Sequence, residues 1–256
     1  MRSLPLALGL AAAAPAEAQQ LAYADVAEAG VASAGAGAGD SPAAAPTWLR
    51  YALLDRFEWN VASGEDGFGW DFSTLVGGEK NRVYLATSGE GGASGRLDYA
   101  ELDALYSRYL GGDIDLNLGI RYDIRPRPSR AYAALGGQYD DGKLWLGAWA
   151  YFSHRGEASA RLAGYYNLPV TGPLVLQPSF ELDANAADVP ELGLGRGLSY
   201  AELGLRLRYR LGKHFAPYLG VSWSRDLGRT ARLTRAAGDD PEAKSVVAGL
   251  NAYWGD

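Results

Sequence analysis

The sequence contains no cysteine, so no disulfide can stabilise the fold and no thiolate is available as a nucleophile or metal ligand. Its only methionine is Met1, and its only histidines are His154 and His214. Soft transition-metal ions, which prefer thiolate and thioether sulfur, therefore find no such ligand after the first residue. Any metal chemistry has to rest on carboxylates and on two imidazoles.

Long apolar runs and basic clusters are missing too. After residue 18 the sequence has no apolar stretch of about eighteen residues, so it predicts no transmembrane helix. Lys and Arg do not cluster and the net charge is −6, which argues against a nucleic-acid partner. In contrast, 34 Gly, 16 Tyr and 7 Trp are typical of strands and tight turns.

The first residues have the layout of a secretory signal peptide. Arg2 gives a positive start, an apolar run follows, and Ala16-Glu17-Ala18 is a small-x-small cleavage site. Residues 1–18 are therefore expected to be removed on export. Residues 19–47 are rich in Ala and Gly and bury too little apolar surface to offset the entropy of ordering, so a flexible, disordered leader is expected there.

Period-two alternation dominates the sequence from residue 48 onward. In the segments 115–123, 174–183 and 202–210, apolar residues alternate with polar or charged ones, and a helical period fits none of the three. With weaker alternation elsewhere, the sequence predicts twelve strands, at 51–60, 68–77, 81–89, 97–109, 115–123, 129–139, 143–153, 157–168, 174–183, 202–210, 215–226 and 244–254.

The connections alternate in length along the chain. Tight turns are expected at 77–80, 111–113, 140–142, 170–173 and 212–214, and longer polar links at 61–67, 89–96, 184–198 and 227–243. Short turns at one end, longer loops at the other and an even number of strands are typical of a bacterial outer-membrane barrel. For residues 48–256 we therefore predict an all-β fold, a transmembrane antiparallel up-and-down β-barrel. A soluble β-sandwich would show the same alternation and stays open as an alternative.

The polar face of the strands is expected to line the inside of this barrel. A charged network in the lumen is predicted from Arg121, Glu181, Asp183, Glu202, Arg206 and Arg208. Aromatic residues near strand ends would suit the two membrane–water interfaces, because the ring body prefers acyl chain and the polar edge prefers water. These are Trp59, Trp70, Tyr106, Tyr122, Tyr166, Tyr209, Trp223 and Trp254.

Several longer motifs resemble the copper-resistance protein B family, over roughly residues 48–254. They are DRFEW at 55–59, GGEKNR at 77–82, ELDALYSR at 101–108, GIRYD at 119–123 with PRPSR at 126–130, LQPSFE at 176–181, GRGLSYAELGLRLR at 195–208, FAPYLG at 215–220 and RAAGD at 235–239. The resemblance implies an outer-membrane protein of copper resistance and copper homeostasis that binds copper ions. Family members often carry Met- and His-rich repeats ahead of the barrel, whereas residues 19–47 contain neither residue.

The inventory of ligands restricts any copper site. Cu(II) is a more plausible ion than Cu(I), because only imidazole and carboxylate ligands are present, and weak binding is expected. Candidate ligands are His154, His214, Glu65, Asp66, Asp239 and Asp240. The two histidines fall at opposite ends of the predicted barrel, so they are not expected to share one ion.

Other functions are less consistent with the sequence. Ser153 and His154 are adjacent, but neighbours on a strand point to opposite faces, so they do not form a nucleophile and base, and no enzyme is predicted. A passive outer-membrane pore or a structural barrel without a metal site remains the alternative. The expected location is the cell outer membrane, and the expected partners are its lipids, copper ions and other periplasmic copper-resistance proteins, with no nucleic acid.

Overall fold

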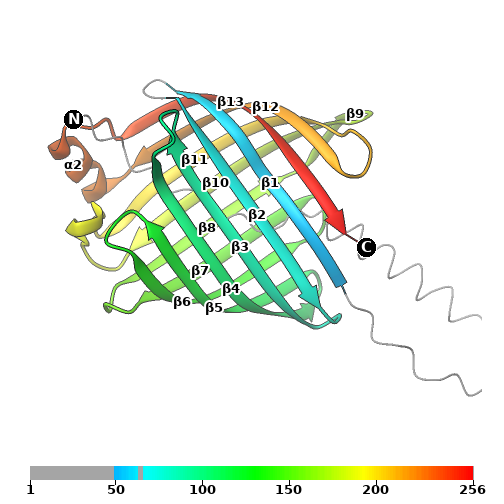
Figure 1. Cartoon of the computed structure of the whole chain (residues 1–256), viewed down its shortest axis with the longest axis horizontal. Coiled ribbons are helices and arrows are strands. Elements are labelled where there is room, and N and C mark those ends of the chain that lie inside the picture. The colour runs from blue at the N-terminus through cyan, green and yellow to red at the C-terminus, as the bar shows by residue number, and fades with distance from the viewer. Residues whose placement is uncertain (1–48, 63–65, 256) are drawn as a thin grey trace, which may run out of the picture.

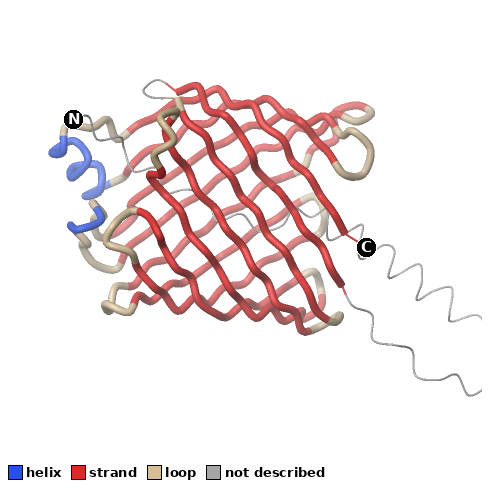
Figure 2. The backbone as a smooth tube through the Cα atoms, in the orientation of Figure 1, coloured by secondary structure: helices blue, strands red, loops and turns tan. Residues whose placement is uncertain are grey.

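The computed structural model of the chain describes residues 49–62 and 66–255 (Figure 1). The signal peptide and leader assigned to residues 1–47 lie outside the described residues, as does the candidate ligand Glu65. Strands make up almost the whole body of the molecule, and the connections lie at its two ends (Figure 2).

Thirteen strand segments follow one another along the chain. Their bounds are β1 Leu49–Ala62, β2 Gly67–Gly77, β3 Asn81–Gly92, β4 Leu97–Gly111, β5 Ile114–Arg125, β6 Arg130–Asp140, β7 Leu144–Ser153, β8 Ala158–Tyr166, β9 Leu168–Thr171, β10 Leu174–Asn185, β11 Gly197–Tyr209, β12 Phe215–Asp226 and β13 Glu242–Gly255. A 3₁₀ turn, η1 (Pro190–Leu192), and one helix, α2 (Gly228–Ala237), lie in the connections.

All neighbouring strands are antiparallel, and the sheet closes on itself because β13 pairs with β1. The segments β8 and β9 lie end to end along β10, interrupted at Asn167, so they form one strand of the wall. The predicted fold, a closed up-and-down barrel of twelve antiparallel strands, is therefore confirmed.

The outer wall is apolar and the interior is polar. On β11, Leu203 and Leu205 are 55% and 42% exposed, whereas Glu202 and Arg206 on either side of them are buried. The same inversion recurs around the wall, where large apolar side chains are exposed and charged ones are buried. A soluble β-sandwich would bury its apolar face instead, so the alternation belongs to a barrel whose outside faces hydrocarbon.

No helix in the described parts of the chain, 49–62 and 66–255, has the length and apolar character needed to cross a bilayer.

The two ends of the barrel differ as predicted. At the short-turn end, the connections are 78–80, 112–113, 141–143, 172–173 and 210–214. The hairpin at Gly112-Asp113 has positive φ at both residues, 61° and 62°, which is the backbone of the two-residue turn that matches strand twist. At the opposite end, called the loop end below, the connections are 63–66, 93–96, 126–129, 154–157, 186–196 and 227–241.

Several predicted boundaries at the loop end were wrong. The links placed at 61–67 and 89–96 are shorter, because β1 and β3 extend to Ala62 and Gly92. The link at 227–243 contains α2, which was not predicted. Its first turn has no side-chain cap, so the usual sequence signal for a helix start is missing. The helix lies against β11 and β12 and buries Thr230 and Ala231.

An apolar cluster fills much of the interior toward the short-turn end. It is centred on Leu53, Leu75 and Leu105, which come from β1, β2 and β4, and it includes several tyrosines. Buried polar groups occupy the rest of the interior, both toward the loop end and beside the short turns, where Arg82 pairs with Asp115.

Candidate functional site

One cluster of charges crosses the interior between β1 and β11. Glu58 accepts hydrogen bonds from Arg206 Nη2 at 3.2 Å and from Tyr218 Oη at 3.0 Å. Arg56 lies 3.4 Å from Glu58 and 3.0 Å from Glu90, and it also pairs with Asp71. Since β12 and β13 separate β11 from β1 in the sheet, the Arg206–Glu58 pair reaches past two strands on the inner side of the wall and does not join adjacent strands.

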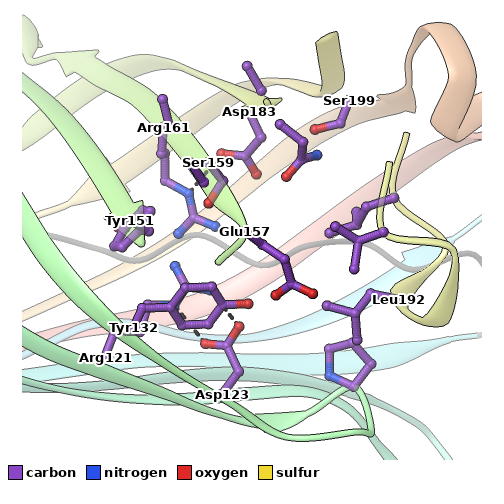
Figure 3. Close-up of a pocket in the computed structure, with 17 residues that line it drawn as sticks. Arg121, Asp123, Tyr132, Tyr151, Glu157, Ser159, Arg161, Asp183, Leu192 and Ser199 are labelled. Atoms are coloured by element: carbon purple, nitrogen blue, oxygen red, sulfur yellow. Dashed lines mark hydrogen bonds and ion pairs between the residues drawn. The ribbon is translucent and has the colours of Figure 1, made fainter. Parts of the chain in front are cut away.

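A second cluster joins β4 and β5 to β8 and β10 on the other side of the interior. Arg121 lies 2.5 Å from Glu101 and 2.7 Å from Asp123, and its guanidinium is 4.7 Å from the ring centre of Tyr151. Arg161 lies 2.9 Å from Asp183 and 3.4 Å from Glu181. Figure 3 shows Arg121, Asp123, Arg161 and Asp183 around one pocket.

The structure places all six residues named for the lumen network on the inward face, and all six are buried: Arg121, Glu181, Asp183, Glu202, Arg206 and Arg208. They do not form one network, because Arg206 belongs to the first cluster, Arg121, Glu181 and Asp183 belong to the second, and the other two have partners outside both. Arg208 pairs with Asp55 at 3.3 Å, and Glu202 accepts hydrogen bonds from Tyr200 at 2.7 Å and Ser222 at 3.1 Å.

Four central residues were not named from the sequence, namely Arg56, Glu58, Glu101 and Arg161. Each alternates with an outward apolar residue, as Phe57 and Trp59 do around Glu58. That parity was the available signal, but it is weaker in these strands than in 202–210. It gives the direction of a side chain and not its partner.

The clusters fill the lumen with paired charge. A buried guanidinium or carboxylate is tolerated only when it is paired and hydrogen-bonded, since removing an ion from water costs several kcal/mol. Here each Arg contacts at least one carboxylate, and the pairs Arg56–Glu90 and Arg206–Glu58 reach past the neighbouring strand. The arrangement cross-links the walls and leaves the middle of the barrel occupied.

An acidic cavity of about 210 Å³ opens above the first cluster at the loop end. Seven acidic residues and one basic residue, Arg56, line it, and the carboxylate of one of the seven, Glu242, turns to Trp223 and Lys244. The acids are Glu58, Asp66, Glu90, Asp98, Glu202, Asp240 and Glu242. This cavity brings together two of the candidate ligands, Asp66 and Asp240, from opposite sides of the β1–β13 seam. Asp239, the preceding residue, is not among the residues that line it.

The two histidines lie at opposite ends of the barrel. His154 follows β7 at the loop end, where its Nδ1 is 3.2 Å from the backbone of Ala131. His214 precedes β12 at the short-turn end, where its Nδ1 is 2.9 Å from the Tyr253 carbonyl oxygen. Neither histidine lines the acidic cavity.

Within residues 49–62 and 66–255, no three His, Cys, Asp or Glu side chains converge closely enough to form a closed metal site. The carboxylates of the acidic cavity are spread around its wall. Oxygen ligands without sulfur suit a loosely held, hydrated Cu(II) ion and do not suit Cu(I).

A smaller cavity, of about 50 Å³, lies beside the second cluster under the connection 186–196 (Figure 3). Leu192 from η1 covers it, and the connection is held by Glu191, which lies 2.8 Å from Arg130 and 3.2 Å from Arg155. Arg130 also lies 3.0 Å from Glu157. Burial alone would raise the pKa of Glu157, but hydrogen bonds from Arg130 and Ser153 outweigh it and lower that pKa.

The side chains of Ser153 and His154, adjacent in sequence, have different partners. The Ser153 Oγ donates to Glu157 Oε2 at 2.7 Å, whereas the His154 ring lies beside Ala131. Ser153 is buried and His154 is exposed, so the two side chains do not act as nucleophile and base.

Known proteins resemble this chain in both sequence and fold. The family model described as "Copper resistance protein B precursor (CopB)" matches residues 48–254. Copper resistance protein B from Escherichia coli is 35% identical over 206 residues, covering 79% of this chain and 68% of that protein. The copper resistance protein B homolog of Pseudomonas syringae pv. tomato is 36% identical over 205 residues, covering 80% and 69%.

Among solved structures, the NanC porin superposes with a TM-score of 0.55 at 12% sequence identity. The superposition covers 78% of this chain and 98% of the porin. At that identity the likeness concerns the fold alone. The family assignment rests on the sequence match, which covers all of the barrel strands except the last residue of β13 and includes both charge clusters. The chain belongs to the copper resistance protein B family.

Proposed function

We propose that this protein is an outer-membrane barrel of copper resistance that takes up Cu(II) weakly and reversibly in the acidic cavity at its loop end. The observation that carries the proposal is the cavity itself, where seven acidic residues and one arginine surround about 210 Å³. Such an excess of negative charge in a recess attracts divalent cations and raises their local concentration.

The location in the outer membrane is supported by the wall of the barrel. A wall with so many exposed apolar side chains is unfavourable in water and favourable in hydrocarbon. Outward aromatics such as Trp59, Tyr122 and Trp254 lie near strand ends. In bacterial barrels the short turns face the periplasm and the longer connections face outward. The acidic cavity, which belongs to the loop end, would then open to the exterior.

The interior argues against an open pore. Toward the short-turn end the lumen holds the apolar cluster around Leu53, Leu75 and Leu105, and above it lie the paired charges. A hydrated ion would have to displace both to cross the barrel. We therefore favour capture of copper at the surface over passive diffusion, with periplasmic copper-resistance proteins as partners on the opposite side.

An enzyme is not favoured within the described barrel, since Ser153 and His154 point apart and the carboxylates of the second cluster are paired with arginine. The proposed role is therefore binding without chemistry. Carboxylate oxygens would exchange with water on a Cu(II) ion, and the filled interior would keep that exchange at the mouth.

The direct test is isothermal titration of the purified full chain with Cu(II), and with Cu(I) under reducing conditions. The variant Asp66→Asn/Asp240→Asn removes two charges from the cavity, and Asp113→Asn removes one at the short-turn end as the matched control. We expect weak Cu(II) binding that falls at least fivefold in the double variant and not in the control. Tight binding of several Cu(I) ions by the barrel would refute the proposal, because no ligand set in it explains such a result.

In cells, deletion of the gene should increase sensitivity to copper, and the parent chain should restore resistance. Single-channel recording in planar bilayers addresses the alternative. Regular conductance steps from the parent barrel would favour a passive pore, whereas a quiet bilayer with reconstituted barrel agrees with the filled interior.

A further inference from the structure

The outer wall carries a shallow groove of about 660 Å³ across β1, β11, β12 and β13, on the half of the barrel nearer the loop end. Its floor is a row of short apolar side chains. The strand register places Val221 between Leu205 and Val246, and Val246 in turn pairs with Val61. Three of these four residues are valines, so the wall is recessed where taller residues such as Leu203 and Trp223 flank it.

The rows above the groove become steadily more polar toward the loop end. The next row holds Leu203, Trp223 and Lys244, and the row after it holds Arg225 and Glu242. All of these side chains point outward, where the strand positions of the wall are otherwise mainly apolar. This sequence of valine, tryptophan and then cation follows the profile of a membrane leaflet from acyl chain to headgroup.

The three polar residues are held together by one carboxylate. Glu242 accepts a hydrogen bond from Trp223 Nε1 at 3.1 Å and lies 3.0 Å from Lys244 and 3.7 Å from Arg225. The side chains of Arg225 and Lys244 are 43% and 71% exposed, so they remain accessible from the membrane surface. Two cations and one anion leave the group with a net positive charge.

From this arrangement we infer a binding site for a phosphorylated glycolipid of the outer leaflet, lipid A. One acyl chain would lie in the valine groove, and a phosphate would contact Arg225 and Lys244. The inference rests on the membrane orientation proposed above, and its two cations, Arg225 and Lys244, are not among the residues that line the acidic cavity. Charge complementarity selects an anionic headgroup, and the loop end selects the leaflet in which lipid A resides.

The test uses the purified full chain in nonionic detergent and native mass spectrometry with three probes: bisphosphorylated lipid A, its dephosphorylated form, and phosphatidylglycerol. We expect one bound lipid A per chain, with at least tenfold weaker binding of the other two. Arg225→Gln/Lys244→Gln should weaken lipid A binding at least tenfold. The matched control is Arg50→Gln/Arg108→Gln, which removes two exposed cations from the short-turn end and should change nothing.

Two further variants separate a specific effect on lipid A binding from a general loss of structure. Glu242→Gln removes the acceptor that competes with phosphate, so it should tighten binding of lipid A. Val246→Trp fills the groove and should weaken binding with both cations intact. Cu(II) titration of each variant distinguishes this inference from the copper proposal, since the charge variants at 225 and 244 should keep their copper response.

Equal lipid A affinity in the parent and the Arg225→Gln/Lys244→Gln variant would overturn the inference, as would equal affinity for phosphatidylglycerol. So would a dimer of the chain that forms over this groove and excludes lipid.

Discussion

The pair between Glu58 and Arg206 offers the sharpest test of the interior. Glu58 is 4% exposed and is the one carboxylate within ion-pair distance of Arg206 among the described residues. The variant Glu58→Leu replaces the carboxylate with an apolar side chain of similar size and leaves the guanidinium of Arg206 buried without a counter-ion. Arg56, by contrast, retains Asp71 and Glu90.

Breaking a buried pair by removing one partner typically costs about 3–5 kcal/mol, because the remaining charge has lost both water and its counter-ion. Tyr218 loses its acceptor as well, but this cost is not simply additive with the first. We therefore expect Glu58→Leu to lower the free energy of unfolding by about 3–5 kcal/mol. Glu58→Leu/Arg206→Met removes both charges and should recover most of that loss, since an apolar replacement of a buried pair is often neutral or stabilising.

The measurement is urea unfolding of the refolded barrel in lipid vesicles, followed by tryptophan fluorescence and by the heat-dependent shift of the folded band on a gel. Glu191→Gln serves as a control. Glu191 also contacts two arginines but its side chain is 57% exposed, so the expected cost is about 0–1 kcal/mol. A single variant as stable as the parent, or a double variant no better than the single one, would refute the reasoning.

Two further predictions concern the wall and the loop end. Leu205→Arg should cost about 2–4 kcal/mol if Leu205 faces the hydrocarbon midplane, whereas Val170→Arg near the short-turn end should cost about 0–1 kcal/mol, both measured by unfolding in vesicles. Because the hydrogen bonds to Glu157 lower its pKa, its contribution to stability is present above the unfolded pKa of about 4.3 and is lost as the pH falls through the lower folded value. Thermal unfolding should therefore show Glu157→Gln less stable than the parent at neutral pH, with the difference vanishing in acid; a constant difference across that range would contradict it.

The sequence was most informative where one strand face meets lipid and the other meets the lumen. In 202–210, each outward residue is apolar and each inward one is charged, small or polar, and the structure follows that parity through β11. The reason is physical, because a shift of one residue would move Arg206 and Arg208 into hydrocarbon. Fold class and strand number could therefore be predicted without knowing any contact.

Strand ends were less predictable because glycine occurs both in turns and inside strands. The run 89–92 was read as part of a loop, yet it continues β3. A Cβ on Gly89 would lie 2.2 Å from the Trp70 ring, so the glycine makes room for an aromatic side chain on the neighbouring strand. Gly136 stands in the same relation to Trp149 at 2.1 Å. Composition alone cannot separate this packing role from a turn.

The partners in the lumen could not be predicted at all. Glu58 and Arg206 are 148 residues apart in sequence, and they meet only because β13 closes onto β1. The acidic cavity has the same origin, since it draws Asp66 from the β1–β2 connection and Asp240 from the connection before β13. Sequence reasoning identified both as loop acids, and only the closure of the sheet places them around one recess.

That closure also sets how far a cation can enter. Across the interior from the acidic cavity, Glu101, Asp123, Glu181 and Asp183 all lie within ion-pair distance of Arg121 or Arg161. A Cu(II) ion that reached them would have to displace a buried guanidinium and leave it unpaired, at a cost of about 3–5 kcal/mol. Weak oxygen ligands do not compensate for such a loss. In the acidic cavity at the mouth, acidic residues outnumber arginine, so a Cu(II) ion can bind there without displacing a buried guanidinium. On the proposed function, the arginines inside the barrel therefore act as fixed counter-ions that keep copper at its outer entrance.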